Sequence, residues 1–448
     1  MLLTQRTIER RVATVLLAAI ILLAATILIR LVSDAWRPLP VSIPPAPPPV
    51  ALSSLEMVSQ LQTRLGQNPE NANLYAQLGL AYLQRARESG DPVFYGLAEK
   101  SLSAALEREP QQLDALIGMG ILALARHDFT TALDWAEQAQ AINPYRAQIL
   151  GIQVDALIEL GRYNDATATL QTMVDLRPDL ASYSRVAYLR ELHGDTTGAI
   201  VAMQRAVEAG LPGSESMLWT QTQLGHLYFN SGQFQQAEAA YHKALHFDSG
   251  YLHALAGMAR IQAATDEDEA ALALYEQVVE TLPWPEYVIA LGDLYALTGE
   301  IDEAARQYDL VRLMQRLNAA AGVDVDLELA LFDLEHSTNP AQTLQAAQAV
   351  YQRRPSLYAA DVLAWALYHN GRYDDAWAYS QEALRLGTQD ALLYYHAGVI
   401  AYALGEAAAA QTHLQQALAL NPAFSLRHAT QAQALLAELA IDKGDAKK

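Results

Sequence analysis

Few side chains in this chain have the types and spacing that chemistry requires. His127 and Asp128 are adjacent and could begin a metal site, but they fall in a short turn between two predicted helices, where a helix cap is the simpler role. The acidic run at 266–269, DEDE, could bind a cation weakly, yet acidic residues also favour the first turn of a helix because they complement its dipole. The eleven histidines show no ligand spacing, so the sequence predicts no metal centre.

Common catalytic and cofactor-binding motifs are absent from the sequence. It has no Walker-A phosphate loop, no strand-borne GxGxxG, no HExxH and no GxSxG. Because it has no cysteine, it can form neither a disulfide, nor a thiolate zinc site, nor a cysteine nucleophile. We therefore expect a protein that is not an enzyme and that uses no cofactor.

The charge is strongly negative and unevenly distributed. The 448 residues carry a formal charge of −20, yet residues 1–50 hold five arginines against two acidic residues. The rest of the chain has 25 basic and 48 acidic side chains, a charge of −23. Such a body repels phosphate backbones, and no basic patch offsets the repulsion, so nucleic-acid binding is not expected.

A repeated pattern of small and aromatic residues organises the chain from about residue 72 to residue 424. Leu291-Gly292, Tyr295, Gly299, Ala304 and Tyr308 recur, with nearly the same offsets, as Leu224-Gly225, Tyr228, Gly232, Ala237 and Tyr241. The most regular marker is an alanine that returns mainly every 33 or 34 residues, with one step of 38 and one double step of 72. These alanines are Ala98, Ala132, Ala166, Ala199, Ala237, Ala271, Ala304, Ala376 and Ala410.

This period and pattern resemble the tetratricopeptide repeat (TPR), a helix–turn–helix unit. The small residues suit close helix approaches, and Gly299 can adopt the positive φ that ends a first helix. The resemblance implies an all-α fold, a right-handed α-solenoid of about ten helix pairs. We expect the array to span 54–424, with a degenerate region around 312–356, and a capping helix with a tail to occupy 425–448.

The resemblance also implies a recognition surface. In TPR proteins the first helices of successive units line a concave face where peptides bind, and arginine and aromatic residues dominate binding hot spots. The alternative is that several of the residues assigned to that face pack between repeats. The period assigns to it Arg185, Tyr188, Trp219, His226, Phe229, Arg260, Asp293, Asp361, Trp365, Tyr395 and Tyr402.

The N-terminus has the composition of a membrane anchor. Residues 12–29 are uncharged over 18 positions, and the span extends to residue 32 if Arg30 reaches the interface. We predict a short basic segment at 1–11 and one transmembrane helix at 12–32. A cleaved signal peptide is the alternative, because Ser33-Asp34-Ala35 offers small residues at a cleavage-like spacing.

Charge and proline content predict how the body relates to that anchor. Arg6, Arg10 and Arg11 precede the apolar span and Arg30 and Arg37 follow it, which favours a cytoplasmic N-terminus. The protein would then be a single-pass protein of the cytoplasmic membrane, with its repeats outside the cytoplasm. Seven prolines in 37–50 predict an extended spacer within 33–53.

These expectations combine into a membrane-tethered scaffold that binds a protein or peptide, within an envelope or translocon-associated assembly. Two alternatives keep the same fold. One is a cytoplasm-facing assembly factor or adaptor, and the other is a non-catalytic subunit of an enzyme complex.

Overall fold

The structure is a computed structural model that describes residues 53–324, 327–336 and 339–445, with side chains as far as Ile441. Its helical repeats form one compact unit, Ser54–Lys448. The predicted anchor at 12–32, the segment 1–11 and nearly all of the spacer at 33–53 lie outside the described residues. Within the residues that are described, no helix is both long and apolar enough to cross a membrane.

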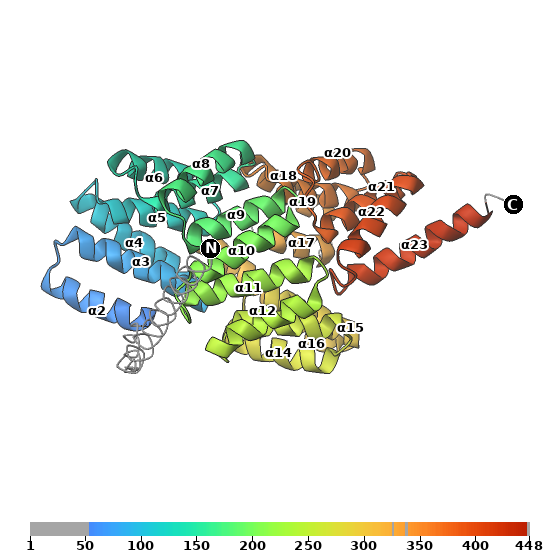
Figure 1. Cartoon of the computed structure of the whole chain (residues 1–448), viewed down its shortest axis with the longest axis horizontal. Coiled ribbons are helices and arrows are strands. Elements are labelled where there is room, and N and C mark those ends of the chain that lie inside the picture. Colours follow the sequence, from blue (N-terminus) through green and yellow to red (C-terminus); the bar gives the residue numbers. More distant parts are fainter. Residues whose placement is uncertain (1–52, 325–326, 337–338, 446–448) are drawn as a thin grey trace, which may run out of the picture. The chain divides into compact units, whose positions relative to one another are not determined.

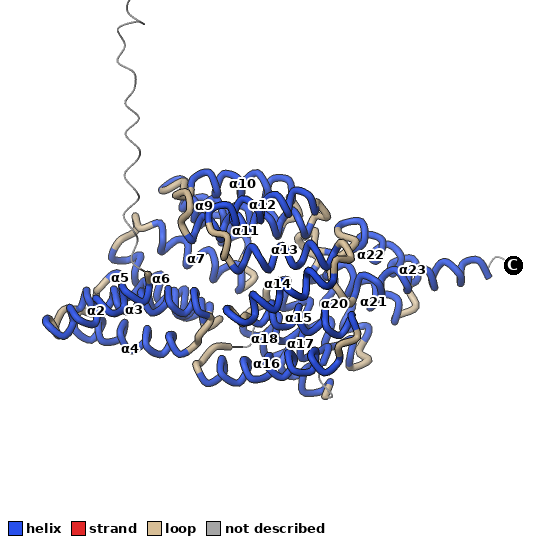
Figure 2. Tube along the Cα trace, turned by 90° about the horizontal axis from the view of Figure 1, so that it is seen from below, coloured by secondary structure: helices blue, strands red, loops and turns tan. Residues whose placement is uncertain are grey.

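The described residues are all-helical, with 22 helices joined by short loops (Figure 1, Figure 2). Helix α2 comes first, ten consecutive helix pairs follow, and α23 comes last, so the all-α solenoid fold is confirmed. The helices are α2 (Ser54–Gln67), α3 (Ala72–Ser89), α4 (Val93–Arg108), α5 (Leu113–Ala125), α6 (Phe129–Ile142), α7 (Ala147–Glu159), α8 (Tyr163–Leu176), α9 (Leu180–Leu192), α10 (Thr196–Ala209), α11 (Glu215–Asn230), α12 (Phe234–Phe247), α13 (Leu252–Ala264), α14 (Asp268–Thr281), α15 (Pro285–Thr298), α16 (Ile301–Ala320), α17 (Leu327–His336), α18 (Pro340–Arg353), α19 (Leu357–His369), α20 (Tyr373–Ala383), α21 (Ala391–Ala403), α22 (Ala407–Leu420) and α23 (His428–Asp445).

Small residues allow the paired helices to approach closely. All nine marker alanines lie in the second helix of their pair and are at most 3% exposed. Tyr241 of α12 is fully buried against two glycines, one in its own pair and one in the next. A Cβ atom on Gly225 or Gly257 would lie 2.3 or 2.5 Å from the Tyr241 ring, so neither site accepts a larger side chain without repacking.

The turns inside the pairs follow from glycine and from capping side chains. Gly299 ends α15 with a φ of +91°, as the sequence predicts. The Asp128 carboxylate accepts a hydrogen bond from the Thr131 backbone amide at 3.1 Å and so caps the start of α6. This is the helix-cap role that the sequence favoured over a metal site. Asp268 and Glu269 occupy the first turn of α14, where the helix dipole favours them.

The repeat period is least regular around α16. This helix runs for 20 residues and ends before Gly322, which has a φ of +74°. The short helix α17 then begins a new pair. A longer second helix displaces the start of the following pair, so the direction of the array can change at this point.

The array packs against itself along a line that we call the seam. On one side of the seam are the turns within five successive pairs, at Gly90, 126–127, Gly161, Gly194 and Gly232. On the other side are five successive junctions that follow the second helix of a pair. Several hydrogen bonds that involve a side chain cross the seam, and they join residues 192 to 197 positions apart in the sequence. These junctions lie at Trp284, Asp324, Pro355, Gly387 and Leu420.

Backbone atoms meet directly at the seam. A Cβ atom on Gly161 would lie 2.4 Å from the carbonyl oxygen of Pro355, and one on Gly194 would lie 2.3 Å from that of Gly387. The backbone N–H of Asp324 donates to the Arg126 carbonyl at 3.0 Å. Glycine is therefore needed at Gly161 and Gly194 both for a positive φ and for this close approach.

Side-chain hydrogen bonds complete the seam. The buried N–H of Leu357 donates to the Tyr163 hydroxyl at 2.8 Å, and the Asn421 amide donates to the Phe229 carbonyl at 2.9 Å. The Thr388 hydroxyl donates to the carbonyl of Leu192. The bonds to Leu357 and Leu192 satisfy backbone groups at helix ends, and the Phe229 carbonyl also accepts from the Gly232 N–H at 2.9 Å.

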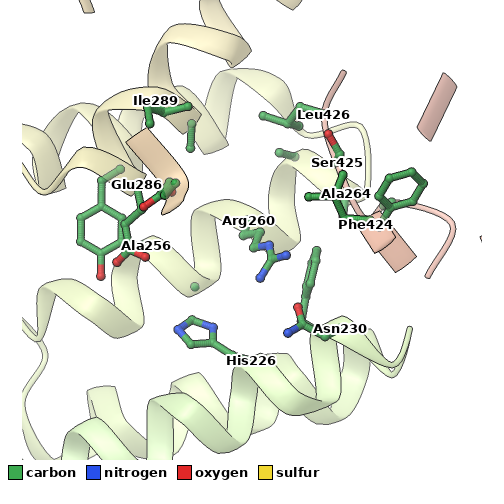
Figure 3. Close-up of a pocket in the computed structure, with 18 of the residues that line it drawn as sticks. His226, Asn230, Ala256, Arg260, Ala264, Glu286, Ile289, Phe424, Ser425 and Leu426 are labelled. Atoms are coloured by element: carbon green, nitrogen blue, oxygen red, sulfur yellow. The ribbon is translucent and has the colours of Figure 1, made fainter. Parts of the chain in front are cut away.

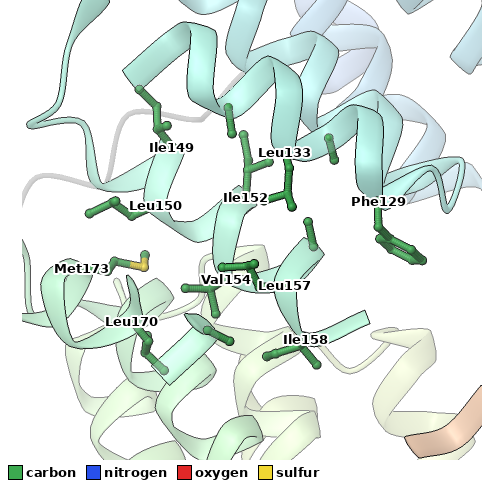
Figure 4. Close-up of a cluster of buried hydrophobic side chains, with 14 of the residues drawn as sticks. Phe129, Leu133, Ile149, Leu150, Ile152, Val154, Leu157, Ile158, Leu170 and Met173 are labelled. Carbon is green, nitrogen blue, oxygen red and sulfur yellow. The ribbon is translucent and has the colours of Figure 1, made fainter. Parts of the chain in front are cut away.

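The apolar core continues across the seam. One cluster of buried side chains includes Ile149, Leu157, Leu170 and Met173 from α7 and α8 (Figure 4), and it also includes Leu357 and Leu393 from α19 and α21. The contact is therefore part of the core of the molecule and not a surface contact.

Candidate functional site

A cavity of about 1620 Å³ lies inside the fold, on the inner side of the seam. Its wall includes the first helices of four successive pairs, α9, α11, α13 and α15. Residues of α17, α19, α21 and α23, together with the loop before α23, complete the lining. The cavity is therefore formed by two parts of the array that the seam holds together.

Seven of the eleven residues that the sequence assigned to the concave face line this cavity. All seven lie on the first helices of four successive pairs, from α9 to α15. Their role in peptide binding stays a prediction. They are Arg185, Tyr188, Trp219, His226, Phe229, Arg260 and Asp293.

Arg260 occupies the middle of the cavity wall. Its guanidinium lies 4.0 Å from the centre of the Phe229 ring, and Figure 3 shows it between His226 and the loop that carries Phe424. In the part of the chain that the structure describes, Arg260 forms no ion pair with a carboxylate. It therefore presents a positive charge to the cavity on an aromatic support.

His226 is held neutral beside this arginine. Its Nδ1 lies 2.8 Å from the Tyr241 hydroxyl. Burial, and then the charge of Arg260, lower the pKa of His226 to about 3. His226 thus acts at neutral pH as an uncharged hydrogen-bonding group.

An aromatic cluster supports one part of the cavity wall, where Trp219 and Tyr287 line the cavity and His253 and Trp284 pack against them. The Trp219 ring meets the His253 ring edge-on at 4.9 Å, and the His253 ring lies 4.6 Å from that of Trp284. The Nδ1 atom of His253 lies 2.6 Å from the Tyr287 hydroxyl. Burial lowers the pKa of His253 to about 4, so this cluster is uncharged at neutral pH and suits an apolar or aromatic group.

Arg185 is already paired within the protein. Its Nε and Nη2 atoms donate to the two carboxylate oxygens of Asp155 at 2.8 and 2.6 Å. Such a two-point pair between a guanidinium and a carboxylate is geometrically specific, so Arg185 shapes the wall more than it offers a free charge.

Two tyrosines and one glutamate form another part of the wall, and an aspartate that does not line the cavity lies next to them. Tyr188 and Glu191 come from α9, Tyr358 comes from α19, and Asp390 caps the start of α21. Burial and the nearby Asp390 raise the pKa of Glu191 to about 7. Burial, followed by Asp390, raises the pKa of Tyr358. We call these four residues the acidic wall.

Asp293 belongs to a polar network that ties α15 to the C-terminal region. Its carboxylate accepts a hydrogen bond from the Tyr308 hydroxyl at 2.8 Å and lies 3.9 Å from Arg427. Arg427 also lies 3.6 Å from Glu335, and the Trp365 indole N–H donates to Glu335 at 3.0 Å. Although burial opposes it, bonding to His428, Trp365 and Arg427 lowers the pKa of Glu335 to about 2.

The remaining four predicted residues do not line the cavity. Asp361, Trp365 and Tyr395 are at most 4% exposed, because the turns of α19 and α21 that carry them are covered by α17 and α23. Tyr395 donates its hydroxyl to Gln431 of α23 at 2.7 Å, and Tyr402 donates to Glu438 at 2.6 Å. For these residues the structure shows the alternative of packing between elements.

The residues on the far side of the cavity were not predicted from the sequence. Tyr358, Glu335, His396 and Arg427 line it, yet they are remote in sequence from α9–α15 and carry no local signal of that contact. Glu191 could have been found, because it follows Tyr188 by three residues on one helix and so shares its face.

The chemistry available in the cavity is recognition by charge, hydrogen bonds and aromatic faces. Within the described ranges no group of three or more His, Asp or Glu side chains could hold a metal ion. The pair formed by His396 Nδ1 and Asp361 Oδ2, 2.8 Å apart, is buried under Trp365 and serves packing. The absence of an enzymatic role stays a prediction, in a fold that is typically a non-catalytic scaffold.

Comparison with known proteins gives a consistent picture. Models of the tetratricopeptide repeat match residues 94–147, 228–288 and 391–424. Cellulose synthase 1 operon protein C of Komagataeibacter xylinus is 24% identical over 260 residues, which are 57% of this chain and 16% of that protein. The chain thus spans well under two thirds of the length of this curated relative.

Two solved structures are among those that match this chain. The APC/C hetero-tetramer Cut9-Hcn1 gives a TM-score of 0.38 at 17% identity, over 86% of this chain and 82% of the other. The human IFIT1 dimer with PPP-AAAA gives a TM-score of 0.46 at 14% identity, over 74% and 77% of the two chains. The repeat matches, together with the succession of helix pairs, show that this chain is a tetratricopeptide repeat protein.

Proposed function

We propose that this chain is a membrane-tethered scaffold that binds a protein or peptide partner in the cavity. The observation that carries the proposal is the composition of the wall, where Trp219, Phe229, Arg260 and Tyr188 lie on successive first helices. These residue types supply most of the binding energy at protein interfaces. The proposed tether rests on the apolar sequence at 12–32 alone.

The match to a cellulose synthase operon protein favours an assembly of the bacterial envelope as the setting. The predicted topology places the repeats outside the cytoplasm, whereas the alternative assembly factor or adaptor would face the cytoplasm. A reporter that is active only outside the cytoplasm, fused after Lys448, distinguishes the two. Activity supports the first topology, and its loss when Arg10 and Arg11 are changed to asparagine would confirm that these charges orient the anchor.

Partner binding is tested by affinity capture of the full chain in detergent, with the bound proteins identified by mass spectrometry. We expect a defined partner that is lost from Arg260→Ala and Trp219→Ala. Arg306→Ala is the matched control, because Arg306 is exposed on α16, does not line the cavity and pairs with Glu303 of the same helix. Equal capture by all variants would contradict binding in the cavity.

A further inference from the structure

The charges that line the cavity are predominantly acidic. Eight carboxylates and four arginines line it, with no lysine. Three of these arginines are already matched within the protein: Arg87 lies 3.0 Å from Glu215, Arg185 lies 2.6 Å from Asp155, and Arg427 lies 3.6 Å from Glu335. The lining therefore carries four more acidic than basic side chains. A concave surface with low-dielectric walls concentrates this negative potential.

The acidic wall is the part of the lining best suited to a cation. Glu191 lines the cavity together with Tyr188 and Tyr358, and Asp390 adds a second carboxylate next to Glu191 and Tyr358 without lining the cavity itself. Among the described residues Glu191 forms no ion pair with an arginine or a lysine, and burial, followed by the charge of Asp390, raises its pKa to about 7. An ammonium or guanidinium group would pair with Glu191, and tyrosine faces attract such groups.

We propose that the cavity binds an extended segment of a partner protein that carries lysine or arginine, and that the acidic wall receives one of these side chains. This inference rests on the proposed function of peptide binding in the cavity and adds the chemical class of the partner. Charge complementarity would also accelerate the encounter, because the repeat body as a whole is acidic.

The test measures fluorescence anisotropy of three labelled peptides of equal length with the full chain in a non-ionic detergent. One peptide alternates leucine with lysine, the second replaces lysine with glutamate, and the third replaces it with glutamine. We expect the lysine peptide to bind at least about tenfold more tightly than the glutamine peptide at low salt, and added salt to reduce the difference.

Variants locate the site. Glu191→Gln keeps the shape of the side chain and should weaken binding of the lysine peptide by about three- to tenfold. Tyr188→Leu removes the aromatic face without changing the charge and should weaken it as well. Glu280→Gln is the matched control, since Glu280 is exposed on α14 and does not line the cavity. It should leave binding unchanged.

The outcomes separate this inference from the proposed function. The inference fails if the lysine peptide binds no better than the glutamine peptide, or if Glu191→Gln and Glu280→Gln behave alike. If the glutamate or glutamine peptide binds more tightly and Arg260→Ala abolishes that binding, the cavity binds peptides of another class and the proposed function stands. If none of the three peptides binds, both proposals are rejected.

Discussion

Two turns of this protein have almost the same sequence and opposite surroundings. Residues 161–166 read GRYNDA and residues 371–376 read GRYDDA. In both, the glycine has a positive φ, +68° and +71°, and the tyrosine begins the second helix of a pair. Yet Tyr163 is 5% exposed in the seam, whereas Tyr373 is 37% exposed. The local sequence determines the turn, and the position in the array determines what the turn contacts.

The glycines give the largest expected difference. Gly161→Ala and Gly371→Ala both place a side chain at positive φ, which costs about 1–2 kcal/mol. At Gly161 the new methyl group would also lie 2.4 Å from the Pro355 carbonyl oxygen, whereas nothing lies within 4 Å at Gly371. We expect Gly161→Ala to lose about 1–3 kcal/mol more. Urea unfolding followed by circular dichroism measures both, and equal losses would show that the seam does not contribute to stability.

The tyrosines give the next difference. Tyr163→Phe removes the hydroxyl that accepts the buried N–H of Leu357, and an unsatisfied buried donor costs about 1–3 kcal/mol. Tyr373→Phe should change the free energy of unfolding by less than about 0.5 kcal/mol because the ring is partly exposed. A loss of the same size in both variants, measured by the same urea titration, would contradict the assigned hydrogen bond.

Glu191 of the acidic wall provides a pH-dependent test. The pKa of Glu191 is raised to about 7 in the folded protein and is near 4.5 when unfolded, so between these pH values the folded state holds a proton that the unfolded state has lost. This group therefore makes the free energy of unfolding fall as pH rises from 4.5 to 7. Glu191→Gln should stabilise the protein by about 1–2 kcal/mol at pH 8 and have little effect at pH 4.

Thermal melts at the two pH values, with Glu280→Gln as the control, check this sign. If Glu191→Gln destabilises the protein at pH 8, then Glu191 is compensated within the protein, which would also weaken the case for a cation partner at the acidic wall.

The arginines of the two turns should show no difference. Arg162 lies 2.7 Å from Asp165, and Arg372 lies 2.5 Å from Asp375, and both pairs are exposed to solvent. Surface pairs of this kind contribute about 0–1 kcal/mol. Arg162→Ala and Arg372→Ala should therefore shift the thermal midpoint equally and slightly. A markedly larger effect of Arg162→Ala would mean that the seam also depends on this arginine.

The sequence predicts much of the fold but little of the seam. Close helix approaches require alanine and glycine at a fixed period, so Ala237 and Gly299 indicate where helices pack and end. Tyr163 and Tyr373 carry the same local signal, so nothing near them distinguishes buried from exposed. Which turn meets which junction depends on small rotations summed over several repeats, and on irregular steps such as the long helix α16.

The dependence of contacts on position in the array also explains which residues of the candidate site the sequence predicts. The period assigns Trp219, Arg260 and Asp293 to one face, and in the structure they line one cavity, because neighbouring repeats suffice to define that wall. Trp365 and Tyr395 were assigned to the same face, but the short helix α17 and the last helix α23 cover them, and neither element belongs to the regular period. Tyr358 and Glu191 meet only because the seam brings α19 to α9.

The most direct test of this account is a cross-link across the seam, which is practical because the chain has no cysteine of its own. The Arg385 guanidinium lies 5.3 Å from the centre of the Tyr163 ring, and its Nη2 atom would lie 3.5 Å from a Cβ atom on Gly161, so Arg385 meets the residues on both sides of Arg162. The double variant Arg162→Cys, Arg385→Cys, treated with a short bismaleimide, should give an intramolecular link that mass spectrometry detects between the two peptides. The control pair Arg162→Cys, Arg372→Cys places the second cysteine at the far end of α19, about 20 Å from the seam, and should not link. A link in the control pair alone, or in neither pair, would contradict the seam and the cavity between the two parts of the array that the seam joins.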